Sequence, residues 1–284
     1  MPVPLAHPAA VLPLRRYCPK YLSFSALIIG SVAPDFAYGI NFRGSFQRLT
    51  SGLLGPAAYN WLSTHGIHSW DSLSHSVLGS VFFCLPVGLL VSLAFRATRT
   101  ALVATLPNPH RDLLLPLCLR KRHSVLAWTV SLLIGTFTHL AWDSLAKDDW
   151  WFARLMPVMR EDVLDVGSAH LQVFRAVWII SSIGGTLVLI FAYLAYLRRH
   201  GHRFWELGPG ESPYYYLWSS VAAFSALIPL AFIARHGRFH LSANGIYYAF
   251  HGFYAVYVTI FGICVAVIAL ISMARGHGSG TQKQ

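Results

Sequence analysis

The chain has 284 residues, of which 55% are hydrophobic and 12% are charged, and its mean hydropathy is +0.50. Soluble domains carry about 25% charged residues, so this composition excludes an ordinary soluble domain. Long uncharged stretches also exclude a disordered or fibrous chain. The sequence therefore predicts an all-α fold, a polytopic bundle of transmembrane helices with the bilayer as its solvent.

The first apolar segments are too short to cross a membrane. Residues 5–14 and 21–33 are apolar, and Arg15, Arg16 and Lys20 lie between them. A spanning helix needs about 20 residues, so these two stretches predict a short N-terminal hairpin that is either re-entrant or interfacial. If its arms are antiparallel, His7 and Asp35 lie at the same open end.

Five later stretches have the length of full spans. They contain no Asp, Glu, Lys or Arg and cover residues 76–95, 124–142, 176–197, 213–234 and 239–274. The last is longer than one span, and Asn244-Gly245 predicts that its helix begins near Ile246. We therefore expect five full spans in a single domain over residues 1–275, followed by a flexible tail over residues 276–284.

The orientation of the bundle follows from its basic residues. One side would hold 14 Lys/Arg and three Asp/Glu if it contains residues 15–20, 96–123, 198–211 and the C-terminal tail. The other side would hold eight of each, so this difference accounts for the whole net charge of +11. The positive-inside rule places the basic side and the C-terminus in the cytoplasm. This charge needs no nucleic-acid partner, and anionic lipid headgroups suit it.

Histidines and carboxylates gather on the opposite side. His75 opens the first predicted span, while His139 and Asp143 close the second. With His7 and Asp35 brought there by the hairpin, five such residues from distant parts of the chain share one depth. Ionisable groups at membrane depth are costly and usually functional, so this set is the main candidate site.

Two local pairs support this interpretation. His139 and Asp143 are four residues apart, as are Asp71 and His75, so each pair shares one face of a helix. Such a pair can bind one ion, or one member can orient the other. The alternative is a hydrogen-bonded pair that fixes helix packing.

Four motifs together resemble one family. They are residues 7–13 (HPAAVLP), 30–38 (GSVAPDFAY), 73–76 (LSHS) and 138–144 (THLAWDS). The set is similar to the domain-of-unknown-function family 4184 of bacterial polytopic membrane proteins and covers most of residues 1–200. It is more loosely similar to inner-membrane metal-dependent hydrolases and zinc-dependent phospholipase C enzymes.

The looser resemblance implies a metal site. Its ligands would be the five residues His7, Asp35, His75, His139 and Asp143. Where the family often has a further histidine, this chain has Lys147, which could hold a phosphate instead of a second ion. The resemblance also implies a location in the bacterial inner membrane.

Two functions of different classes follow. The first is a metal-dependent hydrolase that acts on a lipid phosphoester or ester at the non-cytoplasmic face. Imidazoles and carboxylates suit zinc, or manganese or iron, better than calcium or magnesium. Asp71 would be a general base or the partner of His75, and Arg43, Lys147 or Arg154 would neutralise an anionic headgroup.

The second is a non-enzymatic membrane protein, either a transporter or an assembly partner, in which the polar residues line a pathway or form packing pairs. Serine-hydrolase, P-loop, dinucleotide-binding and zincin motifs are absent from the sequence. Nucleotide-driven chemistry is therefore disfavoured.

Overall fold

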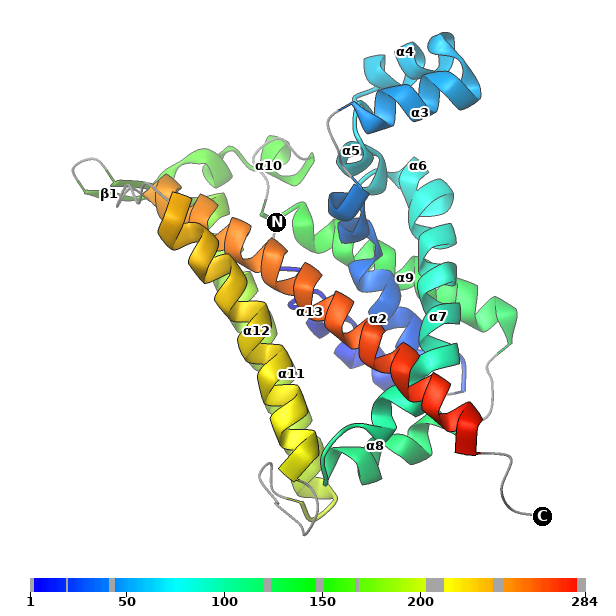
Figure 1. Ribbon diagram of the computed structural model, residues 1–284. Helices are drawn as coiled ribbons and strands as arrows, with labels where there is room; N and C mark the ends of the chain where they lie inside the picture. Colours follow the sequence, from blue (N-terminus) through cyan, green and yellow to red (C-terminus); the bar gives the residue numbers. More distant parts are fainter. Residues whose placement is uncertain are drawn as a thin grey trace. The chain divides into compact units, whose positions relative to one another are not determined.

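The structure is a computed structural model that describes residues 3–18, 20–40, 44–119, 124–146, 151–166, 169–202, 212–236 and 243–279 (Figure 1). It is mostly helical. The chain divides into two compact units, which are described separately. Unit 1 contains Met1–Leu93, His123–Val163 and Gln172–Leu189, and unit 2 contains Ala94–Arg122, Leu164–Leu171 and Ile190–Gln284.

Among the described residues, three helical segments are long and apolar enough to cross a membrane. They are Val77–Ala104, Val125–Asp143 and Val173–Arg199. The first joins α6 (Val77–Gly79), the π-helical turn η3 (Ser80–Cys84) and α7 (Leu85–Ala104), and the other two are α9 and α11. The predicted membrane protein with apolar helices is therefore confirmed, and three of the five predicted spans coincide with these segments.

The N-terminal hairpin consists of short helices. Its first arm contains α1 (Pro8–Val11) and the 3-10 helix η1 (Leu12–Tyr17), and its second contains α2 (Phe24–Val32) and the 3-10 helix η2 (Ala33–Ile40). The rest of unit 1 adds α3 (Ser45–Leu54), α4 (Pro56–Thr64), α5 (Trp70–Ser74), α10 (Trp151–Leu155) and the 3-10 helix η4 (Pro157–Arg160).

Unit 2 contains α8 (His110–Cys118), α12 (Ser212–His236) and α13 (Ala243–Ser279), and α12 packs against α13. The last two predicted spans fall on α12 and α13. Trp218 donates a hydrogen bond from Nε1 to the Thr105 carbonyl oxygen over 2.9 Å. His110 Nδ1 lies 2.5 Å from the Tyr193 hydroxyl, and burial lowers the pKa of this imidazole.

The all-α prediction missed a short sheet. Strands β1 (Asp162–Val166) and β2 (Ala169–Gln172) form a two-stranded sheet. Its sequence signal is weak, because the strands are short and only Gly167-Ser168 between them marks a turn. The expectation of a mostly helical fold holds, with this hairpin as the exception.

Close packing of α2 against α9 fixes the core of unit 1. A side chain at Gly30 would meet the Leu132 carbonyl oxygen at 2.2 Å, and one at Gly135 would meet the Leu27 carbonyl oxygen at 2.3 Å. Small residues at a helix crossing let the backbones approach in this way. The contact also carries a hydrogen bond from the Ser23 backbone N–H to Ser131 Oγ over 2.9 Å. The two helices are thus held at backbone contact distance.

Candidate metal centre

The five predicted ligand residues come from four places in unit 1. His139 and Asp143 occupy the last turn of α9, and His75 is the residue that ends α5. Asp35 lies in the first turn of η2, directly after α2, and His7 precedes α1. The structure brings these side chains together at the end of α9, in two overlapping groups that could hold a metal ion: His7, His139 and Asp143; and Asp35, His75 and His139.

Local sequence features explain how the short elements place their ligands. Pro8 occupies the first turn of α1. Proline has no backbone N–H, but an N–H at this position would have no partner within the helix, so nothing is lost. His7 stands immediately before Pro8. Ser69 caps α5 in a capping box with Ser72, and the Ser76 side chain caps α6. His75 therefore lies in a junction between two capped helices, which restricts its backbone.

Five of the six distances among four candidate ligand atoms are close to those around one tetrahedral ion. His75 Nε2 is 3.3 Å from His139 Nε2, 3.8 Å from Asp35 Oδ1 and 3.5 Å from Asp143 Oδ2. His139 Nε2 is 3.7 Å from Asp35 Oδ1 and 3.5 Å from Asp143 Oδ2. A tetrahedral zinc with bonds of about 2.0–2.2 Å separates its ligand atoms by about 3.3–3.6 Å. The spacing therefore fits a single metal ion.

Both Nε2 atoms present a lone pair to this cluster. His139 Nδ1 lies 2.8 Å from the Ser31 carbonyl oxygen, and His75 Nδ1 lies 3.0 Å from Asp71 Oδ1 and 2.9 Å from the Asp71 carbonyl oxygen. Each Nδ1 must donate its proton to these acceptors, which leaves the Nε2 of a neutral ring unprotonated. Two imidazole lone pairs and two carboxylate oxygens thus face one another, and a cation is the species that attracts all four.

Asp35 supports this conclusion independently. Its side chain is buried, and neither carboxylate oxygen accepts a hydrogen bond from the residues that the structure describes. A buried carboxylate is costly unless it is paired or bound to a metal. His139 and Asp143 are also fully buried, so the cluster lies in a low-dielectric environment that strengthens attraction to a cation.

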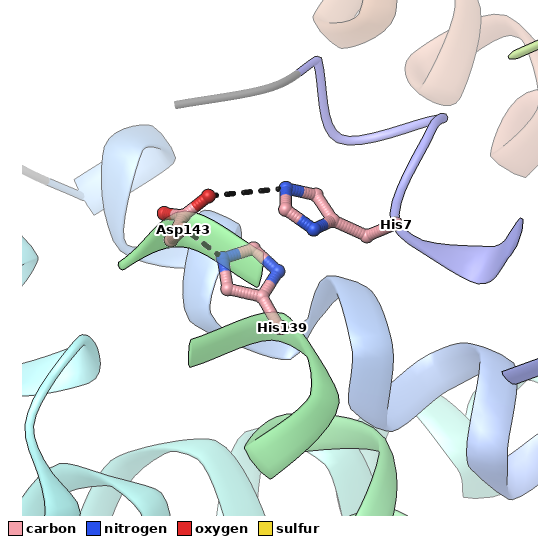
Figure 2. Close-up of side chains that lie close together, drawn as sticks. All are labelled: His7, His139 and Asp143. Carbon is pink, nitrogen blue, oxygen red and sulfur yellow. Dashed lines mark ion pairs between the residues drawn. The ribbon is translucent and has the colours of Figure 1, made fainter. Parts of the chain in front are cut away.

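His7 reaches the other oxygen of Asp143. Its Nε2 lies 3.5 Å from Asp143 Oδ1, and its ring stacks on that of His139 with centroids 3.8 Å apart. Figure 2 shows His7 and His139 approaching the same carboxylate. His7 therefore contacts the cluster through Asp143, either as a further ligand or as the group that orients this carboxylate.

The remaining predicted site residues differ in placement. Asp71 contacts His75 on Nδ1, the nitrogen that faces away from the cluster, and it also interacts with the Tyr38 hydroxyl. Arg154 is exposed on α10. Lys147 and Arg43 lie outside the residues that the structure describes. The sequence left two roles open for Asp71, and its contact with Nδ1 favours orientation of His75.

Sequence reasoning missed the backbone acceptor of His139. The carbonyl oxygen of Ser31 fixes the tautomer of this histidine. Every residue has a backbone carbonyl group, so a pattern of side chains cannot predict which one accepts this hydrogen bond. Gly30 and Gly135, which let α2 approach α9, were the available signal. Ser74 was also missed: its hydroxyl lies 2.9 Å from His75 Nδ1.

Comparisons with known proteins give one match. The model of the family described as domain of unknown function (DUF4184) matches residues 1–274. No curated protein and no solved structure matches the chain.

Proposed function

The chain belongs to the DUF4184 family, whose description assigns no activity, and we propose that it is a membrane-embedded metal-dependent hydrolase acting on a lipid phosphoester or ester. The observation that carries this proposal is the close approach of four candidate ligand atoms, with separations of 3.3–3.8 Å for five of their pairs: His75 Nε2, His139 Nε2, Asp35 Oδ1 and Asp143 Oδ2. A packing pair needs only two such groups, so four groups gathered at one point favour a bound cation over a packing role.

Zinc is the proposed metal, with manganese or iron as alternatives. Two imidazole nitrogens and two carboxylate oxygens form a ligand set that these ions accept, whereas calcium and magnesium prefer all-oxygen shells. A bound ion of this kind supplies a water of lowered pKa and polarises a phosphoryl or carbonyl oxygen.

The position of the cluster favours hydrolysis at a membrane surface. Asp143 is the last residue of the span Val125–Asp143, and His75 lies two residues before the span Val77–Ala104. A transport pathway would place ionisable groups near the middle of the spans, whereas these groups lie at span ends. Beside Asp35, the side chains of Phe36, Tyr38 and Ile40 on η2 are substantially exposed, which provides apolar surface for a lipid chain at the edge of the site.

The other site residues receive roles that match their contacts. Asp71 holds His75 with Nε2 directed into the cluster, so we assign it a positioning role. His7 holds the second oxygen of Asp143. Lys147 follows α9 by four residues, and its ammonium would pair with the phosphate of an anionic substrate.

The proposed topology completes this assignment. α12 and α13 would supply the last two of five full spans, with the C-terminus on the cytoplasmic side of the bacterial inner membrane and the cluster on the opposite side. The support is the distribution of Lys and Arg in the sequence.

Metal analysis and lipid hydrolysis together test the proposal. Protein purified in lipid nanodiscs should contain bound metal, and His139→Ala should lose it because one of the four ligands is removed. After reconstitution with zinc, the wild type should release headgroup or fatty acid from phospholipids, as measured by mass spectrometry. His65→Ala is the matched control, because His65 is exposed and contacts Trp61, away from the cluster.

A wild type that folds normally yet binds no metal would refute the metal site and favour a packing or transport role. Metal that is bound without hydrolysis of any phospholipid phosphoester or ester would refute the proposed reaction alone. Retention of full metal content by His139→Ala would contradict the ligand assignment.

A further inference from the structure

The helical hairpin formed by α3 and α4 carries large apolar side chains that the rest of unit 1 leaves exposed. Leu53 is 73% exposed, Leu54 is 68% exposed and Trp61 is 56% exposed. Phe46 and Thr50 of α3 are buried, which packs the first part of this helix onto the protein. The hairpin therefore has one side that faces the protein and an apolar tip that faces away from it.

Residues 45–64 contain a single charged residue, Arg48. The remaining polar residues are uncharged, and Tyr59 and Trp61 are amphipathic aromatic residues of the kind enriched at the boundary between membrane and water. Short helices with an apolar face and aromatic residues lie in this boundary in many membrane proteins. A soluble protein partner would more often be recognised through a polar, hydrogen-bonding rim.

The hairpin lies at the same end of unit 1 as the metal cluster. In the sequence it stands between Asp35 and Asp71, and Figure 1 shows α3 and α4 side by side next to α5. Trp70, the first residue of α5, donates a hydrogen bond from Nε1 to Ser45 Oγ over 3.0 Å and packs edge-on against Phe46. The next residue is Asp71, which contacts His75.

From these contacts we propose that the tip of the α3–α4 hairpin inserts into the lipid leaflet on the side of the metal cluster. Leu53, Leu54 and Trp61 enter the boundary between headgroups and acyl chains, while Arg48 reaches the headgroups along its flexible stem. One span begins at Val77 and another ends at Asp143, so the membrane surface on this side lies at the level of the cluster. The leaflet on this side therefore lies beside the hairpin. Lipid is thus the occupant of the exposed apolar surface.

Photo-crosslinking in nanodiscs of phosphatidylethanolamine and phosphatidylglycerol tests this proposal. Leu53→p-benzoylphenylalanine should form lipid adducts on illumination, detected by mass spectrometry, several-fold more often than the matched variant Gln47→p-benzoylphenylalanine. Gln47 is also exposed and lies on the same helix, but near its first residue and away from the apolar tip. A melting temperature equal to that of the wild type shows that each variant is folded.

Three results would overturn the proposal: equal lipid adducts at both positions, adducts to a second copy of the chain at Leu53, or no adduct at either position. The experiment uses no substrate, so its failure is distinct from a failure to detect hydrolysis. Lipid insertion could be observed in a chain that has no hydrolase activity.

Discussion

The orientation of two imidazole rings decides whether the cluster can bind a cation. His139 donates from Nδ1 to a backbone carbonyl group, and His75 donates from Nδ1 to Asp71. No substitution can remove the backbone carbonyl group that accepts from His139, whereas the Asp71 side chain that accepts from His75 can be replaced. Asp71 is therefore the residue at which ring orientation can be tested without touching a ligand.

Asp71→Asn should weaken metal binding by about 10–100-fold, the usual cost of losing the outer partner of a ligating histidine. The amide no longer supplies the charge that favours a proton on Nδ1, so the metal-binding tautomer of His75 becomes less populated. Competition with a chromogenic chelator measures the change in affinity.

Asp71→Glu provides the matched comparison, because it keeps the carboxylate and should recover part of the affinity. A general base would behave differently: its loss would lower kcat and leave metal affinity unchanged. Unaltered affinity in Asp71→Asn would therefore contradict the positioning role.

Residue patterns predicted part of the site, for reasons that the geometry makes clear. The four-residue spacing of His139 and Asp143 places both on one helix face wherever the helix lies, so that pair was visible in the sequence. The predicted hairpin placed His7 and Asp35 at the same end, but the atoms that they approach depend on the packing of α1 and α2 against α9, which has no signature in spacing. The same limit left the role of Asp71 open, because sequence proximity to His75 does not say which nitrogen it meets.

At the scale of elements, the crossing of α2 and α9 determines the site. The Ser31 carbonyl group reaches His139 only because the two backbones touch at Gly30 and Gly135. A side chain at Gly135 would lie 2.3 Å from the Leu27 carbonyl oxygen and 2.7 Å from the Ser31 backbone nitrogen. Backbone atoms cannot move aside as a flexible side chain can, so the helices would have to separate.

Gly135→Ala should destabilise the protein by about 1–3 kcal/mol, the usual cost of overpacking a core, and should also lower metal affinity through the displaced Ser31. Thermal unfolding in detergent measures the first effect and chelator competition the second. Gly184→Ala, within the α11 span, is the control, because nothing lies within 4 Å of the added carbon. It should be neutral or slightly stabilising, since alanine favours helices over glycine.

Equal melting temperatures for the two glycine variants would show that α2 and α9 tolerate a wider separation. We expect the melting temperature to fall in Gly135→Ala and to stay equal or rise slightly in Gly184→Ala, although both variants add the same methyl group. This contrast isolates the close approach of the two backbones from helix propensity.

At the scale of the whole molecule, the sequence predicted the class of protein more reliably than its details. Scarcity of charge over long stretches identified the apolar helices, because an uncharged run of that length is a candidate span, and three of the five runs coincide with spans in the described residues. The β1–β2 hairpin was missed because strands this short carry little hydrophobic periodicity. The distribution of Lys and Arg also predicts which ends of the helices face the cytoplasm, and this orientation stays a prediction.

Metal binding should couple to global stability, because the ligands come from four separate segments of unit 1. A ligand that binds only the folded state adds about 2.7 kcal/mol when its concentration is about 100 times its dissociation constant. The melting temperature of chelator-treated protein should therefore rise progressively with added zinc, as measured by thermal unfolding in detergent. His139→Ala should show no such rise, since the unfolded chain offers no assembled site and the variant lacks one ligand. A zinc-dependent rise of equal size in His139→Ala would place the stabilising metal somewhere other than this cluster.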